Sequence, residues 1–288
     1  MAISILSNVA SLRAQRQLGV TSLSLEQTFE RLASGQRINR AADDAAGLAI
    51  SASLRQDIRV AATAMRNAND GISLISIADS AMGEITSVLQ RMAELAAQSA
   101  NGTYDTRQRS PLQAEFAALA AEIERISSTT KFNGLPILSG AANVILQVGL
   151  RSDANSRISI SGVQATLESV LLAAPGTANL IYSINANTNS DAQTAARTAL
   201  DAVFAAIQEV GSRRGLLGAA ESRLSSTISN LSSAREALEQ ADSRIRDADI
   251  ASEAANAIRL KILQEAASSI LAQANQQPAL AVRLLSNS

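Results

Sequence analysis

The N-terminal segment repeats apolar residues at intervals typical of an amphipathic helix. They lie three, four or seven positions apart, which places them on one helical face. These residues are Ile5, Val9, Leu12, Leu18, Leu25, Phe29 and Leu32. We expect the helix to end at Ser34-Gly35, since glycine readily adopts the left-handed conformation that terminates a helix. The pattern fits a helix packed on its own core, or one without a partner until it meets another subunit.

The longest regular pattern predicts a single helix of about fifty residues, roughly 75 Å long at 1.5 Å per residue. An unbroken seven-residue series consists of Leu54, Ala61, Ala68, Ile75, Met82, Leu89 and Ala96. A companion series lies four residues ahead at first (Ile58, Met65, Ile72) and then three ahead (Ile85, Met92). So long a helix indicates bundle or coiled-coil packing. Gly71 and Gly83 lie within it, and a close backbone approach would explain them.

Two capping signals predict further helices. Ser110-Pro111-Leu112-Gln113 opens one that runs to about Thr130, and Ser190-Asp191-Ala192-Gln193 opens another that runs to about Gln240. A last helix begins at Ile250 and ends near Gln277-Pro278. It carries an apolar seam with alternating spacings of three and four residues: Leu260, Leu263, Ala267, Ile270 and Ala274.

One region favours β structure. Residues 144–148 and 157–161 flank a polar loop, and the second run alternates apolar and polar residues, so we predict a β-hairpin near 143–162. Residues 133–136 form a turn signal, and a short strand is conceivable within 180–184. The fold class is therefore mainly α, an elongated helical bundle with a terminal coiled coil and a small β-hairpin.

Composition argues against an enzyme. The 288 residues include no His, no Cys and no Trp, which removes imidazole bases, thiolate nucleophiles and the commonest zinc ligands. We therefore expect no catalytic residue, cofactor or metal, although Asp and Glu could still do acid–base work. The net charge is −1 and the basic residues are dispersed, so the sequence shows no basic patch of the kind that binds nucleic acid. Neither a long apolar run nor a cleavable signal sequence is evident, so we expect no membrane insertion, and export would use an uncleaved segment.

Several long motifs resemble bacterial flagellins. The most specific covers residues 32–50, LASGQRINRAADDAAGLAI. It is joined by RNANDGIS at 66–73, ELAAQSAN at 94–101 and KFNG at 131–134, and near the other end by SRIRDAD at 243–249 and ILAQANQ at 270–276. The likeness covers roughly the first 140 and last 95 residues, in the family's order.

This resemblance implies a structural subunit that self-assembles into the extracellular flagellar filament used for swimming. It also implies an inner domain from residues 1–35 and 250–288, connectors at 36–44 and 243–249, and an outer helical domain at 45–242. The family's partners would be further copies of the chain, the flagellar export apparatus, an export chaperone and a filament cap. Rival interpretations are a hook–filament junction protein and a secreted helical adhesin or effector.

Assembly would bury apolar side chains of the terminal helices between subunits. The expected assembly seam is Ile5, Val9, Leu12, Leu25, Phe29, Leu32, Leu260, Leu263, Ala267, Ile270 and Ala274. The connector residues of interest are Gly35, Arg37, Asn39, Asp43 and Asp44. The two adjacent carboxylates could form a metal or acid–base site, but negative charge in the first turn of the long helix is the better explanation. Arg37 and Arg40 are close enough in sequence to pair with them.

Arg91, Leu95 and Glu115 match the family positions that engage Toll-like receptor five. Arg91 and Leu95 are four residues apart, which predicts that they share one helical face. Without the resemblance, Arg91 and Leu95 would be interpreted as an exposed charged residue and a leucine at the edge of the core, with no role in receptor binding. This alternative stays open.

Overall fold

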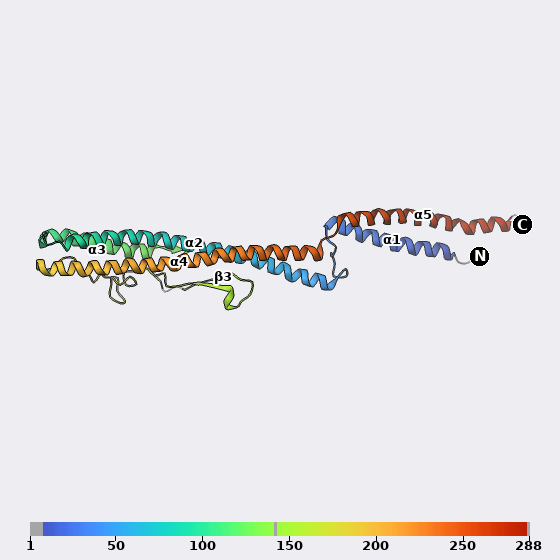
Figure 1. Cartoon of the computed structure of the whole chain (residues 1–288). Coiled ribbons are helices and arrows are strands. Elements are labelled where there is room, and N and C mark those ends of the chain that lie inside the picture. The colour runs from blue at the N-terminus through green and yellow to red at the C-terminus, as the bar shows by residue number, and fades with distance from the viewer. Residues whose placement is uncertain (1–7, 141–142, 287–288) are drawn as a thin grey trace. The chain divides into compact units, whose positions relative to one another are not determined.

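The computed structural model of the chain describes residues 8–140 and 143–286. Within them it contains five α-helices and two small antiparallel sheets (Figure 1). In chain order the elements are α1 (Val9–Ser34), α2 (Ala45–Ser99), α3 (Thr106–Thr129), β1 (Lys131–Phe132), β2 (Leu135–Pro136), β3 (Val144–Gln147), β4 (Arg157–Ile160), α4 (Asn189–Arg246) and α5 (Ile250–Ser286). The predicted fold class, mainly helical with a small β-hairpin, is confirmed.

The chain divides into two compact units. The terminal unit comprises Met1–Ile58 and Glu236–Ser288, and the central unit comprises Arg59–Arg235. Because the divisions fall inside α2 and α4, each of these long helices contributes residues to both units.

The buried face of α2 follows a regular alternation of three and four residues throughout the central unit. The seven-residue series predicted from the sequence is buried from Ala61 to Ala96. Its companion lies three residues ahead along the whole length, at Ala64, Gly71, Ala78, Ile85, Met92 and Ser99. The predicted switch from four ahead to three ahead is therefore wrong. In the first half of the helix the buried companion positions carry the small residues Ala64 and Gly71. The larger apolar residues next to them, Met65 and Ile72, made the neighbouring positions look like the buried ones in the sequence pattern.

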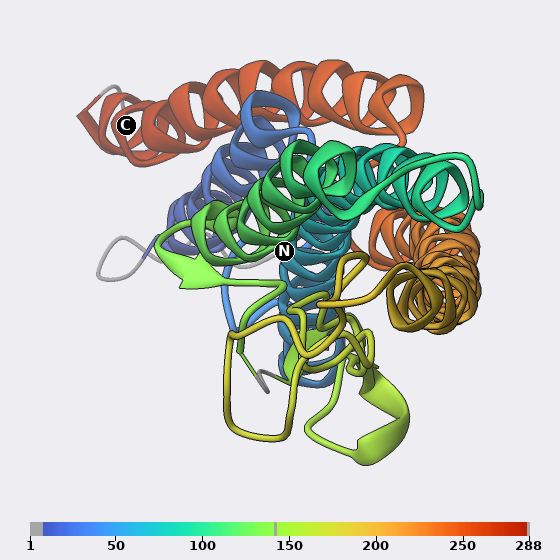
Figure 2. The same cartoon turned by 90° about the vertical axis from the view of Figure 1, so that its left-hand side faces the viewer.

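Helices α2, α3 and α4 pack side by side around this face (Figures 1 and 2). Phe116 and Ile123 from α3 and Val203 and Leu217 from α4 are at most 1 % exposed and belong to the same core. By length and composition, α2 is the one helix among the described residues that could cross a membrane. The same helix supplies the buried seam, so we attribute its hydropathy to the core.

A buried arginine joins the ends of the three helices. Arg109 is fully buried, and its guanidinium donates to the carbonyl oxygens of Ser99 and Asn101, both at 2.9 Å, and to Asn189 Oδ1 at 3.0 Å. Carbonyls at a helix C-terminus lack intrahelical partners and carry partial negative charge. Arg109 therefore provides hydrogen-bond donors for the carbonyls at the C-terminal end of α2. Because Arg109 belongs to the first turn of α3 and Asn189 begins α4, the same side chain also holds the starts of these two helices together.

Both predicted capping boxes are displaced from the true ones. Helix α3 is capped by Asp105 and Gln108, whose side chains exchange hydrogen bonds with each other's backbone N–H at 2.8 and 3.0 Å. Pro111 lies inside the helix. Helix α4 is capped by Thr188, whose hydroxyl accepts from the Asp191 N–H at 3.2 Å. In each case a capping residue a few positions upstream starts the helix earlier than the signal we chose.

The C-terminal ends of α4 and α5 also differ from prediction. Helix α4 continues past Gln240 to Arg246, and α5 continues past Gln277-Pro278 to Ser286. A proline removes one backbone donor from a helix, but it does not prevent the helix from resuming.

The predicted hairpin is present, with β3 and β4 antiparallel in the register Val144↔Ile160 to Gln147↔Arg157. A second, smaller hairpin was missed. Asn133 and Gly134, with φ of 48° and 81°, form the two-residue turn between β1 and β2. The conceivable strand at 180–184 is reduced to an isolated bridge between Ala173 and Leu180.

The two glycines of α2 provide a matched pair of substitutions. A Cβ at Gly71 would lie 2.3 Å from Leu146 Cδ1 and 3.1 Å from Leu224 Cδ1, whereas a Cβ at Gly83 would meet no atom within 4 Å. We expect Gly83→Ala to raise the free energy of unfolding by about 0.5–1 kcal/mol because it removes unfolded-state entropy. We expect Gly71→Ala to lower it by about 1 kcal/mol because the β-hairpin leucine is displaced. Urea denaturation of the free subunit measures both, and equal shifts would contradict the assignment.

Candidate functional site

Helices α1 and α5 pack against each other in an antiparallel arrangement within the terminal unit (Figure 1). The residues that face the partner helix recur every three or four positions and are buried or half-buried. On α1 they are Ser11, Ala14, Leu18, Thr21, Leu25, Thr28 and Leu32, and on α5 Glu253, Ala257, Leu260, Gln264, Ala267, Leu271 and Ala274. We refer to these residues as the pairing seam. Only five of its fourteen positions carry leucine, and the others are small or polar, so the contact buries little apolar area.

Many other large apolar side chains of the two helices lie outside the seam and are exposed. Ten of the eighteen exposed large apolar residues in the described part of the chain lie on α1 and α5, each 49–64 % exposed. They are Val9, Leu12, Val20, Leu23, Phe29, Ile250, Ile258, Ile262, Leu263 and Ile270. We refer to these as the outer apolar face. Such a concentration is unusual on a protein that works alone, and it marks an interaction surface.

The structure divides the predicted assembly seam between these two surfaces. Leu25, Leu32, Leu260, Ala267 and Ala274 lie in the pairing seam. Val9, Leu12, Phe29, Leu263 and Ile270 lie on the outer apolar face. Ile5 is outside the described residues. In α5 the pairing seam contains Gln264 and Leu271. The prediction instead chose Leu263 and Ile270, the apolar residues directly before them, and these are exposed.

The connector segments are joined to each other by backbone hydrogen bonds. Gly35, with φ of 71°, caps α1, and its carbonyl accepts from the Ala248 N–H at 3.0 Å. Arg37 donates its backbone N–H to the Arg246 carbonyl at 2.6 Å and a guanidinium N–H to the Ile245 carbonyl at 2.7 Å. We refer to these contacts as the connector bridge. It links Gly35 and Arg37, which follow α1, to the last turn of α4 and to Ala248 between α4 and α5.

Asp43 and Asp44 fold the connector and start α2. The Asp43 carboxylate accepts from the backbone N–H of Arg40 at 2.9 Å and of Asn39 at 3.0 Å, and these bonds lower the pKa of Asp43. Asp44 accepts from the Gly47 N–H at 2.8 Å in the first turn of α2. Arg40 pairs with Glu30 at 2.8 Å instead of with either aspartate. The hydrogen bonds that both aspartates accept from backbone N–H groups support the capping explanation. Among the described residues no group of three or more potential metal ligands occurs.

A side-chain staple joins α2 to α4 inside the terminal unit and was not predicted. Asp242 accepts a hydrogen bond from Ser51 Oγ and pairs with Arg55 at 3.1 Å. Burial opposes ionisation here, but the hydrogen bonds from Ser51 and Arg55 outweigh it and lower the pKa of Asp242. Its partners are 187 and 191 residues distant in sequence, and no local pattern could reveal them.

Two of the three predicted receptor residues meet at the surface of the central unit. Arg91 on α2 pairs with Glu115 on α3 and with Glu94, each at 2.9 Å, and the Arg91 side chain is 50 % exposed. Leu95 is 1 % exposed and belongs to the core. Arg91 and Leu95 therefore do not share an accessible face, because the buried side of α2 is broad enough at this level to include position 95.

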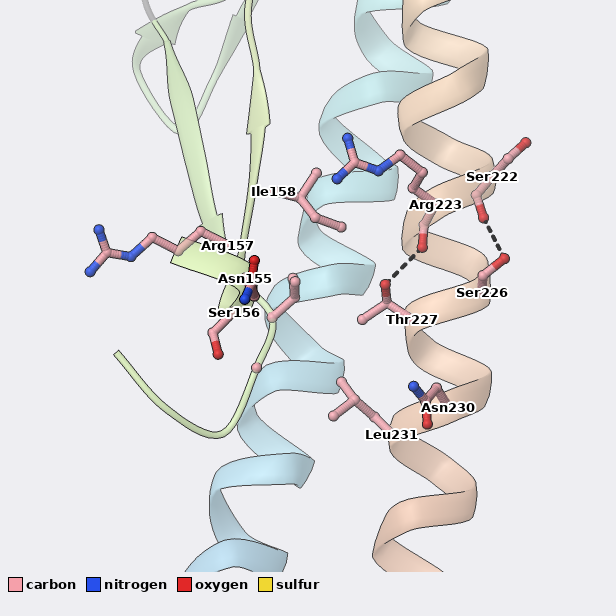
Figure 3. Close-up of a pocket in the computed structure, with 12 residues that line it drawn as sticks. Asn155, Ser156, Arg157, Ile158, Ser222, Arg223, Ser226, Thr227, Asn230 and Leu231 are labelled. Carbon is pink, nitrogen blue, oxygen red and sulfur yellow. Dashed lines mark hydrogen bonds between the residues drawn. The ribbon is translucent and has the colours of Figure 1, made fainter. Parts of the chain in front are cut away.

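A groove of about 540 Å³ lies between the β-hairpin and α4 in the central unit (Figure 3). Val148, Ile158 and Leu231 contribute apolar surface to it. The hydroxyls of Ser226 and Thr227 are already bonded to carbonyls of their own helix at 3.0 and 2.8 Å (Figure 3). The lining contains no carboxylate, so the groove offers no acid–base pair or metal-ligand set.

The lowered pKa values of Asp43 and Asp242 predict acid sensitivity of the terminal unit. A carboxyl with a pKa below its unfolded value of about 3.9 stabilises the fold above that pH, and this stabilisation is lost as pH falls through the folded pKa. We expect the thermal unfolding temperature of the subunit, followed by its helical circular dichroism, to decrease as the pH is lowered from about 5 to about 3. Asp242→Asn should flatten this dependence, whereas Asp70→Asn in the central unit should not. Identical profiles for the parent chain and Asp242→Asn would contradict the assigned role.

Comparison with known proteins identifies two family regions. Residues 5–143 match the bacterial flagellin N-terminal helical region, and residues 200–285 match the bacterial flagellin C-terminal helical region. A flagellin of Halalkalibacterium halodurans is 42 % identical over 279 residues, which are 96 % of this chain and 98 % of that protein. A flagellin of Bacillus subtilis is 38 % identical over 299 residues, with the same coverage of the two chains.

Two solved structures are also similar to parts of this chain. The crystal structure of Bacillus cereus flagellin is 28 % identical and covers 58 % of this chain and 88 % of that one, with a TM-score of 0.47. A putative flagellar hook-associated protein from Vibrio parahaemolyticus covers 71 % of this chain at 12 % identity and a TM-score of 0.54, which indicates a shared fold alone. The family regions and the full-length relatives decide the matter: this chain belongs to the bacterial flagellin family.

Proposed function

We propose that copies of this chain assemble into a helical filament chiefly by burying the outer apolar face of α1 and α5 against neighbouring subunits. As a flagellin, the chain is a structural subunit of a homopolymeric, extracellular flagellar filament, and the family is not an enzyme family. The assignment of that assembly to a particular surface rests on one observation. More than half of the exposed large apolar residues in the described part of the chain lie on these two helices.

The energy available from this surface is of the right size. Complete burial of a large aliphatic or aromatic side chain stabilises by about 1.5–3 kcal/mol, so covering the exposed half of ten such residues yields on the order of 10 kcal/mol. Association costs about 4–15 kcal/mol in lost translational and rotational freedom. A subunit that enters a filament makes contacts on several sides, and the burial at these contacts together offsets this cost. Head-to-tail contacts that do not close into a ring produce an open helical array.

The family resemblance supports a layered arrangement of the subunit in the filament. We propose that residues 1–35 and 250–288 form the inner layer, with 36–44 and 243–249 as connectors and 45–242 as the outer helical domain. The connector bridge supports this proposal because it ties the two connecting segments together. Swimming motility, the export apparatus, an export chaperone and the filament cap also enter the proposal through the resemblance.

We also propose that Toll-like receptor five recognises the surface around Arg91 and Glu115. Both side chains are accessible, with 50 % and 44 % exposure, and an exposed ion pair costs little to rearrange on binding. Leu95 would act from beneath the surface, by fixing the position of α2, since it is itself buried.

A hook–filament junction protein remains the nearest rival, and a secreted helical adhesin or effector a more distant one. The likeness to a hook-associated protein extends to the fold alone. Electron microscopy of the purified chain separates these functions, because only a filament subunit should form long filaments without another protein.

Polar substitutions on the outer apolar face should prevent assembly without unfolding the central unit. We expect Leu23→Ser with Ile262→Ser, at positions 64 % and 60 % exposed, to abolish sedimentable filaments and to leave the thermal unfolding of the subunit unchanged. Ile145→Ser, at an equally exposed position of the central unit, is the matched control and should polymerise. Normal filaments from the double variant would contradict the proposed surface.

The receptor proposal predicts a selective loss of signalling. In a reporter-cell assay with depolymerised protein, Arg91→Ala and Glu115→Ala should each reduce potency about tenfold, a loss of about 1.4 kcal/mol that is typical of an interface contact. Arg125→Ala removes a comparable exposed arginine, paired with Glu122 at 2.5 Å on α3, and should leave potency unchanged. No response to the parent protein would overturn the proposal.

A further inference from the structure

Four polar contacts cross the pairing seam at intervals along α1. Asn8 Nδ2 donates to the Ala274 carbonyl at 2.7 Å, Ser11 Oγ to Asn275 Oδ1 at 2.7 Å, and Gln264 Nε2 to Ser22 Oγ at 3.1 Å, while Arg31 pairs with Glu253 at 3.2 Å. We refer to these four contacts as the polar ladder. They span the seam from its N-terminal end on α1 to the last turn of that helix.

The apolar part of the seam cannot by itself fix how far α1 is shifted along α5. Leu18, Leu25 and Leu32 are spaced by seven residues, and Ala267 and Ala274 repeat at the same interval on α5. A slip of seven residues, about 10 Å along the helix, would still place the three leucines of α1 against apolar residues of α5, namely Leu260, Ala267 and Ala274. Since the seam has few large side chains, the two registers would differ little in buried apolar area.

The polar ladder distinguishes these registers because each of its contacts exists in only one of them. A slip would leave the Glu253 side chain, which is 13 % exposed, without the Arg31 guanidinium. It would also leave the Ser11 hydroxyl, in a residue 7 % exposed, without Asn275. Buried polar groups without partners are costly, and a polar residue at a coiled-coil contact is a well-attested means of fixing register.

We infer that the polar ladder sets the stagger of α1 on α5 and thereby aligns the outer apolar face across the two helices. Ser11, Ser22, Gln264, Arg31 and Glu253 are positioning residues in this account. The consequence for filament geometry rests on the proposed assembly function. The register itself is a property of a single chain and does not.

The connector bridge is the competing cause of the stagger. It holds Gly35 against Ala248, close to the Arg31–Glu253 pair, and so restrains one end of the helix pair. The experiment must therefore remove the ladder's three contacts between side chains, in a variant that we call the ladder-free chain, and leave the bridge intact. Asn8 is also kept, because its side chain caps α1 by accepting from the Ser11 N–H at 3.0 Å.

Distance measurement between two spin labels reads the stagger directly. The chain contains no Cys, so Gly19→Cys on α1 and Ala255→Cys on α5 give unique label sites. Both positions are exposed, and a Cβ at position 19 would meet no atom within 4 Å. Pulsed electron paramagnetic resonance is recorded on the free full-length subunit and on filaments in which labelled copies are diluted with unlabelled ones.

The ladder-free chain carries Ser11→Ala, Gln264→Leu and Arg31→Met. The control carries Ser269→Ala, Gln273→Leu and Arg16→Met, which make the same chemical changes at exposed positions of the same helices. We expect one distance in the parent and control chains, with at least about a tenfold excess of that register. The ladder-free chain should show a second population displaced by up to about 10 Å and of similar size to the first. Arg31→Glu should shift part of the population, and Arg31→Glu with Glu253→Arg should restore the single distance.

An unchanged single distance in the ladder-free chain would overturn the inference and assign the stagger to the connector bridge. The absence of a preferred distance in the parent chain, in both the subunit and the filament, would overturn it as well. Failure of the parent chain to polymerise would instead contradict the proposed assembly function, and the distance in the subunit would still decide the register.

Discussion

Two helices packed together can cover only the sides that face each other, and in α1 and α5 those sides carry mainly small and polar residues. Ten large apolar side chains lie instead on the outer apolar face, where each is 49–64 % exposed. A third surface is therefore needed to complete the terminal unit. We propose that further copies of the chain supply that surface, so that incomplete burial in the single subunit drives its assembly.

The central unit has the opposite character. Helix α2 buries an uninterrupted seam against α3, α4 and the β-hairpin, and Arg109 closes the helix ends with three hydrogen bonds. Its core is therefore formed within a single chain. The connector bridge and the Asp242 staple both lie in the terminal unit. The bridge joins the end of α1 to the end of α4 and to Ala248, and the staple joins α2 to α4.

The sequence predicted features that depend on local periodicity and long motifs. The lengths of α1 and α2, the left-handed Gly35 and the hairpin follow from spacing and turn chemistry. The division between the pairing seam and the outer apolar face did not follow, because both consist of residues three or four apart and the seam prefers small side chains to large ones. Contacts such as Asp242 with Ser51 and Arg109 with Asn189 join segments that are far apart in the sequence. The spacing of apolar residues within one segment carries no information about such contacts. Leu95 was misplaced because spacing alone does not give the width of a buried face.

Hydrogen exchange of backbone amides in the free subunit and in the filament tests the central claim most directly. If the terminal unit is completed by neighbouring copies, amides of α1 and α5 should exchange rapidly in the subunit, because a contact of small and polar residues opens locally at low cost. In the filament they should slow by at least about a hundredfold, which corresponds to about 2.7 kcal/mol, while the central unit changes little. Strong and equal protection of α1 and α5 in both states would contradict the account.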